Sequence, residues 1–333
     1  DTIFTGFGSA HNIVINEESG YAYIVGAPRN STYGGGAIFI NIQDPINPVI
    51  EGGFSEGGYS HDAQVITYNG PDTDYTAKEI LIGSNEDEIV IADVTDKTNP
   101  TVIATISYSN VEYAHQGWFT EDLKYFILGD ELDELRIGNN ARTIVFDFTD
   151  LDNPLYHFDY FGATAAIDHN GYVKDNIYYQ ANYTAGVRMI DISNTENKVF
   201  SEIGFFDTYP NNNNTAFNGV WNVYPYFPSG NIIISDIDNG FFVIRKSGTL
   251  NVAPKTAGVN FSLFPNPANS QTTIRTANKE TIKNIKIYSI LGKKIIDIKN
   301  INKPQYVLKT ESLEKGMYLL KINGKLTKKF IVE

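Results

Sequence analysis

No cysteine occurs among the 333 residues of this chain. Disulfide bonds, thiolate metal ligands and thiol nucleophiles are therefore excluded. The sequence also lacks an apolar run of the roughly 18 residues that a membrane-spanning helix needs, and it shows no signal peptide, so we expect a mature or trimmed product. A Gly-x-Ser-x-Gly elbow, a phosphate-binding loop and a dinucleotide fingerprint are absent as well. These absences argue against the enzyme classes that carry such motifs.

Positive charge is scarce in the first three-quarters of the chain. Residues 1–250 carry 11 Lys and Arg against 34 Asp and Glu, whereas residues 251–333 carry 15 against 5. The net charges are −23 and +10, an asymmetry that indicates two units with different partners. The acidic part would repel nucleic-acid phosphates, and the lysines of the basic part alternate with apolar residues, as on the solvated face of a small β domain. We therefore expect no nucleic-acid partner.

Four of the five histidines recur at a nearly constant interval. His11, His61, His115 and His169 are separated by 50, 54 and 54 residues, and each precedes a short apolar or aromatic run. A period of about 50 residues built from short strands is typical of β-propeller blades, whose inner strands converge on a central channel. The four imidazoles are therefore predicted to lie at equivalent places on successive blades. The fifth, His157, falls in a predicted outer strand, where a structural role is expected.

A second repeated segment supports this interpretation. Each copy is a strand that ends in an Asx-type turn, at Asp96 and Asp150 for example, and in three copies a following Asn-Pro stops the strand. The copies are residues 36–48, 88–100, 142–154, 186–197 and a shortened 240–245. For the third unit the pattern predicts four strands, at about residues 115–120, 124–129, 142–148 and 155–161.

The predicted fold class is all-β: a propeller of four-stranded blades, five of them in this chain, followed by a small β-sandwich domain. A β-sandwich alone would accommodate the strands but would not explain the period. The fifth unit ends near Arg245 without an outer strand, and Thr2 to Phe7 is a predicted strand before the first histidine. That strand either completes the fifth blade and closes the ring, or is the remnant of an upstream blade in an N-terminally truncated propeller.

Several rare strings occur in a fixed order through the first part of the chain. They are Gly-Ser-Ala-His-Asn at 8–12, Asn-Gly-Pro-Asp-Thr-Asp-Tyr at 69–75, Ser-Asn-Glu-Asp at 84–87, His-Gln-Gly-Trp at 115–118, Asp-Glu-Leu-Asp-Glu-Leu at 130–135 and Gln-Ala-Asn-Tyr at 180–183. Residues 1–246 resemble the choice-of-anchor B family of bacterial surface proteins, and the Ile-x-Asp-Val/Ile/Phe strand endings resemble LVIVD repeats. The resemblance implies a surface location and a propeller of more than five blades, which leaves ring closure open. It implies no particular reaction.

The tail of the chain carries four further strings. They are Phe-Ser-Leu-Phe-Pro-Asn-Pro-Ala at 261–268, Ile-Tyr-Ser-Ile-Leu-Gly at 287–292, Leu-Glu-Lys-Gly-Met-Tyr-Leu at 313–319 and Lys-Lys-Phe-Ile-Val-Glu at 328–333. This part resembles the C-terminal sorting domain of type IX secretion substrates. The resemblance implies the type IX secretion machinery as a partner and an extracellular or outer-membrane-surface location. The predicted domains are thus a propeller over 1–246, a linker over 247–258 and a sorting domain over 259–333.

Strand order predicts which residues meet at one rim of the propeller. If the histidine opens the innermost strand, the loop between the second and third strands returns to the same rim. Imidazoles, carboxylates and amides gather there, the usual composition of a metal or polar-ligand site. In the fifth unit Asn218 is predicted to take the place of the histidine. The predicted binding residues are His11, His61, Asp62, Asn85, Glu86, His115, Asp130, Glu131, His169, Asn182, Asn218 and Asp236.

Three functions fit such a rim. The first is a binding or adhesion module for an extracellular glycan, peptide or protein. The second is a metal-dependent hydrolase in which His61, His115, Asp130 and Glu131 hold a divalent metal. The third is a structural surface protein whose histidines only tie neighbouring blades together. Asp72 and Asp74 are a separate candidate for calcium.

The binding module is the favoured function, because no recognisable nucleophile accompanies the histidines. The cofactor is not specified by the sequence beyond a divalent metal or calcium. Imidazoles next to carboxylates are expected to have a raised pKa, so a ligand held by cationic histidine would bind more weakly as the pH rises.

Overall fold

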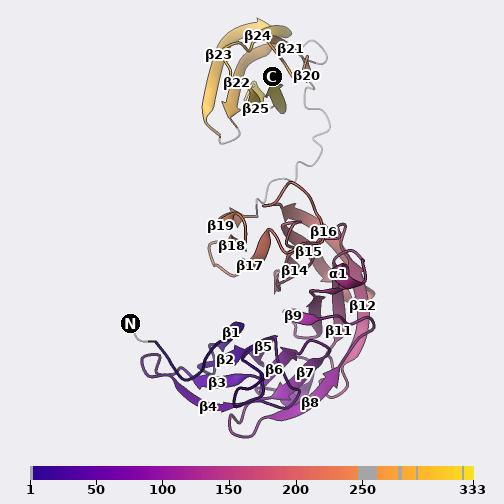
Figure 1. The fold of residues 1–333 in the computed structure, drawn as a ribbon. Helices are drawn as coiled ribbons and strands as arrows, with labels where there is room; N and C mark the ends of the chain where they lie inside the picture. The colour runs from indigo at the N-terminus through magenta and orange to yellow at the C-terminus, as the bar shows by residue number, and fades with distance from the viewer. Residues whose placement is uncertain (1–2, 247–260, 277–279, 290–291, 325) are drawn as a thin grey trace. The chain divides into compact units, whose positions relative to one another are not determined.

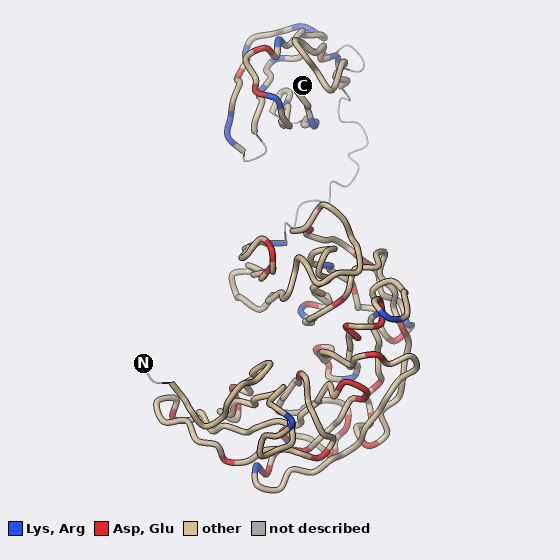
Figure 2. The backbone as a smooth tube through the Cα atoms, in the orientation of Figure 1, with Lys and Arg blue, Asp and Glu red and all other residues tan. Residues whose placement is uncertain are grey.

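The computed structural model describes residues 3–246, 261–276, 280–289, 292–324 and 326–333, and nearly all of its elements are β-strands (Figure 1). The chain divides into two compact units, Asp1–Lys246 and Ser247–Glu333. The predicted linker, 247–258, lies outside the described residues. Acidic side chains are distributed along the first unit, whereas Lys and Arg are frequent in the second (Figure 2).

The first unit contains five antiparallel sheets, here called blades 1 to 5, each formed by consecutive strands. Blade 1 is β1 (Asn12–Asn16), β2 (Tyr21–Val25), β3 (Ile38–Asn41) and β4 (Val49–Gly53); blade 2 is β5 (Asp62–Thr67), β6 (Glu79–Ser84), β7 (Ile89–Asp93) and β8 (Thr101–Ile106). Blade 3 is β9 (Ala114–Phe119), β10 (Tyr125–Asp130), β11 (Arg142–Asp147) and β12 (Leu155–Phe161); blade 4 is β13 (Gly171–Lys174), β14 (Ile177–Ala181), β15 (Val187–Asn194) and β16 (Val199–Phe206). Blade 5 has three strands, β17 (Val220–Tyr224), β18 (Asn231–Asp236) and β19 (Gly240–Arg245).

The prediction of four-stranded units is confirmed closely in blade 3, where each strand starts and ends within about one residue of the expected position. The Asx turns are confirmed as well. The Asp96 carboxylate accepts a hydrogen bond from the Thr98 N–H at 2.9 Å, and the Asp150 carboxylate accepts one from the Asp152 N–H at 3.0 Å. Short polar side chains that bond to the backbone just ahead of them end the third strand of these blades.

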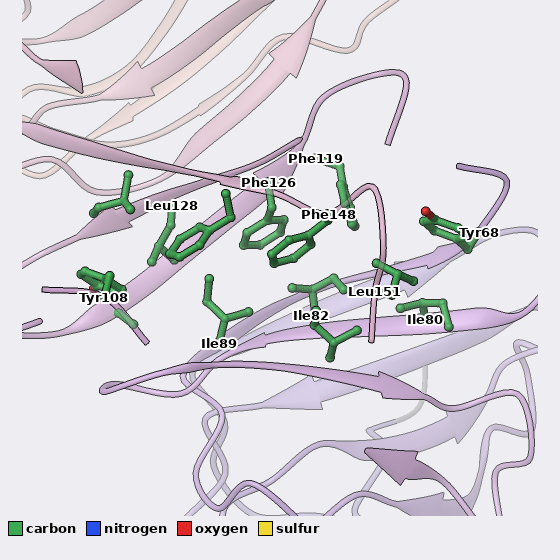
Figure 3. Packing of buried hydrophobic residues seen from close by; sticks show 14 residues of the cluster. Tyr68, Ile80, Ile82, Ile89, Tyr108, Phe119, Phe126, Leu128, Phe148 and Leu151 are labelled. Atoms are coloured by element: carbon green, nitrogen blue, oxygen red, sulfur yellow. The ribbon is translucent and has the colours of Figure 1, made fainter. Parts of the chain in front are cut away.

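Neighbouring blades are held together by apolar side chains that project from both sheets. Between blades 2 and 3, Phe119, Phe126 and Phe148 pack with Ile80 and Ile82 in one buried cluster (Figure 3). The rings of Phe126 and Phe148 are stacked, with centroids 5.4 Å apart. Burying each such side chain contributes about 1.5–3 kcal/mol. The first strand of blades 1 to 3 lies on the inner side of an arc and the last strand on its outer side (Figure 1).

The predicted N-terminal strand is wrong for its described part, because residues 3–7 form no strand. Phe4 and Phe7 instead pack against the buried cluster of blade 1 that contains Ile24 and Ile38. The pattern of apolar residues that predicted a strand has another cause here, because Phe4 and Phe7 cover an apolar face of blade 1. Among the described residues no strand of blade 1 pairs with blade 5, so β19 has no outer neighbour and the five blades form an open arc (Figure 1).

The second unit is a small sandwich of two antiparallel sheets. One sheet has the order β20-β21-β24, formed by Phe261–Phe264, Gln271–Thr276 and Gln305–Lys309; the other has the order β23-β22-β25-β26, formed by Lys294–Lys303, Ile282–Ser289, Gly316–Ile322 and Leu326–Val332. Ile285 and Ile287 of β22 alternate toward a core that also contains Ile274 and Leu308 of the first sheet. The alternation predicted for this segment is confirmed.

Candidate functional site: a row of four histidines

Four histidines from four successive blades lie side by side along the inner strands. The ring centroids of His11 and His61 are 3.9 Å apart, those of His61 and His115 are 4.6 Å apart, and those of His115 and His169 are 4.4 Å apart. His11 is exposed, whereas the other three are buried. We call these four side chains the histidine row. It begins at the solvent and runs into the protein.

Backbone pairing determines where each imidazole lies. The N–H groups of His11, His61 and His169 donate hydrogen bonds of 2.8–3.0 Å to the carbonyl oxygens at the ends of the neighbouring second strands. Each histidine therefore stands at the beginning of an inner strand, at the same level of its blade. The blades repeat the same geometry, so the side chains meet in one row.

The residues after His11 and His115 tie their blades to the next ones. The Asn12 side-chain amide donates to the Asp62 carboxylate at 2.9 Å, which links blade 1 to blade 2. The Gln116 amide donates to the Gly171 carbonyl at 3.2 Å and accepts from the Gly171 N–H at 2.8 Å, which links blade 3 to blade 4. Asp62 is thus a buried structural partner, and burial raises its pKa to about 6.

Trp221, and not Asn218, stands in the histidine position of blade 5. In blade 3 the pairing with the second strand skips from Ala114 to Gln116, so His115 is an unpaired, bulged residue. In blade 5 the pairing skips in the same way from Val220 to Asn222, so Trp221 is the bulged residue that corresponds to His115. The Trp221 ring accordingly follows His169 in the row, with centroids 4.6 Å apart. Asn218 lies outside the row, where its amide donates to Asp238 at 3.2 Å.

The imidazoles of the row are neutral near pH 7. Burial lowers the pKa of His61 to about 3 and that of His169 to about 4, and it holds the pKa of His115 well below its ordinary value. Repulsion between neighbouring imidazoles adds to the effect, and burial also lowers the pKa of His11. The expectation of raised histidine pKa values is therefore wrong, because removal from water outweighs the attraction of the single nearby carboxylate.

Glu131 lies between the two deepest histidines. One carboxylate oxygen of Glu131 is 3.6 Å from His115 Nε2 and the other is 3.6 Å from His169 Nε2. Its position is stabilised by the Tyr183 hydroxyl, which donates to it at 2.7 Å. Burial raises the pKa of Glu131, although the Tyr183 hydrogen bond opposes the shift. At 3.6 Å neither contact is a hydrogen bond.

The tautomer of His169 follows from its backbone contact. His169 Nδ1 is 2.5 Å from the Trp221 carbonyl oxygen, which can only accept, so Nδ1 carries the proton. Nε2 of the neutral ring then presents a lone pair toward the Glu131 carboxylate. His115 Nδ1 and Nε2 and His61 Nε2 have no hydrogen-bond partner among the described residues, although all three atoms are buried. Leaving such a group unsatisfied costs about 1–3 kcal/mol.

This arrangement of lone pairs fits a metal ion. His115, Glu131 and His169 each offer one ligand atom, and these atoms all lie within 4.8 Å of one another; His11, His61 and His115 form a second such group. Tetrahedral bonds of about 2.0–2.1 Å to zinc would place ligand atoms roughly 3.3 Å apart, close to the 3.6 Å that separates Glu131 from each imidazole. A hydrogen bond from the other ring nitrogen to a backbone carbonyl is the usual support of a metal-binding histidine.

The remaining predicted residues do not join the row. Asp130 is buried and accepts hydrogen bonds from the Tyr108 hydroxyl and from the N–H groups of Glu112 and Tyr113, each at 2.8 Å. Asp236 has the equivalent role in blade 5, where it accepts from the Asp238 N–H at 2.8 Å. Both carboxylates hold backbone at the end of a second strand.

The loop residues are also engaged elsewhere. The Asn85 amide donates to the Gly57 carbonyl at 2.7 Å, and Glu86 forms a 2.6 Å ion pair with Arg29. Asn182 is buried, and its backbone N–H donates to the Gly186 carbonyl at 2.8 Å. The hydroxyl of Tyr113 is 2.9 Å from His61 Nδ1, a contact that sequence reasoning missed although Tyr113 lies two residues before His115.

The two carboxylates predicted for calcium are not a pair. Asp72 lies with Asp150 and Asp152, and its carboxylate accepts from the Leu151 N–H at 2.8 Å. Asp74 contributes only its backbone N–H, which donates to Asp72 at 3.2 Å. A different group was missed: Asp133, Glu134 and Asp168 are buried together between blades 3 and 4. The sequence feature that could have indicated this group is the acidic string at residues 130–134, which contains more carboxylates than a turn requires.

Comparison with known proteins identifies the second unit and the fold of the first. Residues 262–333 match the family described as the secretion system C-terminal sorting domain. A protein from Lactobacillus plantarum shares 13% identity at a TM-score of 0.52, covering 92% of this chain and 90% of its own. The periplasmic gluconolactonase of Pseudomonas aeruginosa shares 10% identity at a TM-score of 0.53, covering 89% of this chain and 87% of its own. No curated protein matches the sequence.

Both structural relatives are β-propeller proteins, and at this level of identity the likeness shows the fold alone. The protein is a secreted, cell-surface β-propeller protein with a type IX sorting domain, which implies an interaction with the type IX secretion machinery. In the part of the chain that the structure describes, no helix is long and apolar enough to cross a membrane.

Proposed function

We propose that this protein is a cell-surface binding module that works through a divalent transition-metal ion held by His115, Glu131 and His169. The observation that carries the proposal is the position of His169 Nε2, whose lone pair faces a Glu131 carboxylate oxygen at 3.6 Å. Two acceptors in this position repel each other unless a cation lies between them. A zinc-like ion supplies that cation and also a partner for the buried nitrogens of His115.

The chemistry of the ligands favours zinc, copper or nickel over calcium or magnesium. Neutral imidazole is a preferred ligand of the later first-row transition metals, whereas calcium and magnesium take oxygen ligands. The low pKa values of His115 and His169 keep the lone pairs available at neutral and mildly acidic pH. The same low values argue against recognition of an anion by cationic imidazole at neutral pH, so we expect the metal ion and not the histidine charge to bind the ligand.

Three protein ligands leave at least one coordination position for a ligand from solution. In structural zinc sites all four positions are filled by protein, whereas open sites bind water or substrate. Of the three proposed ligands Glu131 is the one that is partly exposed, so a ligand from solution would approach the ion from its side. A carboxylate, imidazole or hydroxyl group of an extracellular glycan, peptide or protein would complete the coordination. The resemblance of residues 1–246 to choice-of-anchor B surface proteins supports an extracellular partner of this kind.

The open position also favours a second candidate function, metal-dependent hydrolysis. A zinc ion held by these residues would supply a bound water with a pKa near 7, the nucleophile of ester and amide hydrolysis. The surroundings supply the Tyr113 hydroxyl and the Glu131 carboxylate as polar groups, but Glu131 is a proposed ligand and is not free to act as a base. We therefore place binding first. Turnover of chromogenic esters by the zinc-loaded protein, abolished by a chelator, would reverse this order.

Zinc titration of the chelator-treated full chain by isothermal calorimetry tests the proposal. We expect one strong site, and a loss of affinity of at least about 100-fold in His115→Gln and in His169→Gln, since even indirect supports of a metal cost 10–100-fold. His157→Gln is the matched control. That histidine lies in β12, where Nε2 is 2.9 Å from the Thr195 carbonyl oxygen, and its replacement should leave zinc affinity unchanged.

Two results would contradict the proposal. One is the absence of zinc binding by the wild-type chain. The other is zinc binding that is equal in the wild type and in the His115→Gln and His169→Gln variants. If both variants also melted at a lower temperature, the histidine row would have a purely structural role. Circular dichroism spectra of all variants confirm that a loss of binding is not a loss of folding.

A further inference from the structure

Three carboxylates that the proposed function does not use are buried together between blades 3 and 4. Asp133 and Glu134 belong to α1 (Asp133–Arg136), the short helix that follows β10, and Asp168 precedes β13. Their relative exposures are 0%, 2% and 0%. One carboxylate oxygen from each lies within 4.8 Å of the others. We call these three side chains the buried carboxylate cluster.

Most oxygens of the cluster have no hydrogen-bond partner. Both carboxylate oxygens of Asp133, one of Glu134 and one of Asp168 are buried and unpartnered among the described residues. The partners that do exist are few: the Gln180 amide donates to Asp168 at 3.1 Å, and the Arg142 N–H donates to Glu134 at 3.3 Å. Buried carboxylates normally have a hydrogen-bond or ionic partner at each oxygen. Of these four oxygens, only Asp133 Oδ2 has an ionic partner, the Arg142 guanidinium at 3.6 Å, so the cluster lacks positive charge.

The charge nearby does not balance the cluster. Arg142 is the one cationic side chain among the described residues that is paired with it, and its guanidinium is 3.6 Å from Asp133. The same guanidinium forms a closer ion pair with Asp159, at 2.9 Å. One positive charge is therefore shared by Asp159 and the three carboxylates of the cluster. Burial of unpaired negative charge is strongly unfavourable, so the site requires either bound protons or a bound metal ion.

We propose that the buried carboxylate cluster of Asp133, Glu134 and Asp168 binds a calcium ion that joins blade 3 to blade 4. The ligands are oxygens only, as calcium prefers, and no nitrogen ligand belongs to the group. Calcium–oxygen bonds of 2.3–2.6 Å allow ligand oxygens to be up to about 4.8 Å apart, whereas the roughly 2.1 Å bonds of magnesium demand a tighter group. Calcium is also the common cation of extracellular modules, where it binds at millimolar concentration.

The position of the ion gives it a structural task. Asp133 and Glu134 lie in the loop region of blade 3, two and three residues after Glu131, and Asp168 directly precedes His169. A cation that holds these two segments together would also hold the two segments that carry the deep end of the histidine row. Because the cluster is closed to solvent, the ion enters as the protein folds or when the loop that carries α1 opens.

Refolding of the full chain in calcium or in a chelator tests this inference. Protein refolded in millimolar calcium should retain about one calcium ion per chain after desalting, measured by elemental analysis, and should melt at a higher temperature than protein refolded in chelator. In Glu134→Gln and Asp168→Asn, which keep the side-chain size, we expect the retained calcium and the calcium-dependent shift to disappear. In chelator these variants should melt at or above the wild-type temperature, because one buried negative charge is removed.

The carboxylate group of Asp72, Asp150 and Asp152, in which Asp150 and Asp152 are exposed, provides the control. Asp150→Asn should retain the calcium ion and the thermal shift of the wild type. The inference is overturned if wild-type protein refolded in calcium retains none and melts as in chelator, which would assign bound protons to the cluster. It is also overturned if Asp150→Asn loses the ion while Asp168→Asn keeps it. The calcium content of the wild type decides the question even if a variant fails to fold.

Discussion

At the scale of single residues, burial changes what the histidines can do. Imidazole in water is half protonated near pH 6.5, but in the row removal from water lowers the pKa of His61 to about 3. The neutral ring therefore offers a free lone pair as a ligand and does not change its charge near neutral pH.

The sequence predicted which histidines meet, because their period is regular. It could not predict their protonation, because the number of carboxylates within reach depends on packing: of the acidic residues predicted for the rim, only Glu131 lies beside the imidazoles.

The low pKa of His61 has a consequence for stability. Between about pH 6.5 and pH 3 the unfolded chain binds a proton at His61 that the folded protein does not bind, so stability falls as the pH is lowered through this range. The loss is up to about 1.4 kcal/mol per pH unit for this one residue. In chelator, His61→Gln should lose less stability than the wild type between pH 6 and pH 4.5, as measured by urea unfolding. Parallel curves for the two proteins would contradict the assignment.

At the scale of elements, a buried ion pair within blade 2 accepts hydrogen bonds from blade 1. The Lys97 ammonium and the Glu79 carboxylate are 2.6 Å apart, and both side chains are nearly inaccessible to water. The Asn16 amide of blade 1 donates to Glu79 at 2.7 Å, and the Ser19 hydroxyl donates at 2.6 Å. Burial alone would raise the pKa of Glu79, but these hydrogen bonds and Lys97 together lower it. Glu79 is thus a charged group around which the two blades are joined.

Removal of one partner of this pair should be costly. Lys97→Met keeps the length of the side chain but leaves Glu79 buried without its cation, and we expect a loss of about 3–5 kcal/mol in the free energy of unfolding. Lys124→Met removes a comparable pair at the surface, where the Glu196 side chain is 72% exposed, and should cost no more than about 1 kcal/mol. Chemical denaturation of the two variants compares them directly. Equal losses would mean that the blade 1–blade 2 network does not depend on Lys97.

The elements also mark the limits of sequence reasoning. Strand period and turn residues predicted the strands of blade 3 closely, because alternation and Asx turns are local signals. The position in blade 5 was misassigned because Ala-Phe-Asn-Gly resembles the histidine strings, whereas the bulge that aligns Trp221 with His115 appears only in the strand register. The N-terminal segment was misassigned because Phe4 and Phe7 satisfy a strand pattern and a packing role equally well.

At the scale of the whole molecule, the division into an acidic propeller unit and a basic sorting unit agrees with the boundary at Lys246 and Ser247. Ring closure was beyond the sequence, since pairing between the first and last strands is a long-range contact with no local signal. The buried carboxylate cluster was missed for the same reason. Asp133 and Asp168 are 35 residues apart and meet only because blades 3 and 4 pack side by side.

Anomalous X-ray diffraction from crystals of the full chain grown with zinc tests the central claim most directly. Data collected on both sides of the zinc absorption edge should show a peak within about 2.0–2.1 Å of His115 Nε2, His169 Nε2 and a Glu131 oxygen. Two results would contradict the account. One is zinc peaks at surface carboxylates only, and the other is the absence of a peak at the histidine row in crystals whose protein has bound zinc.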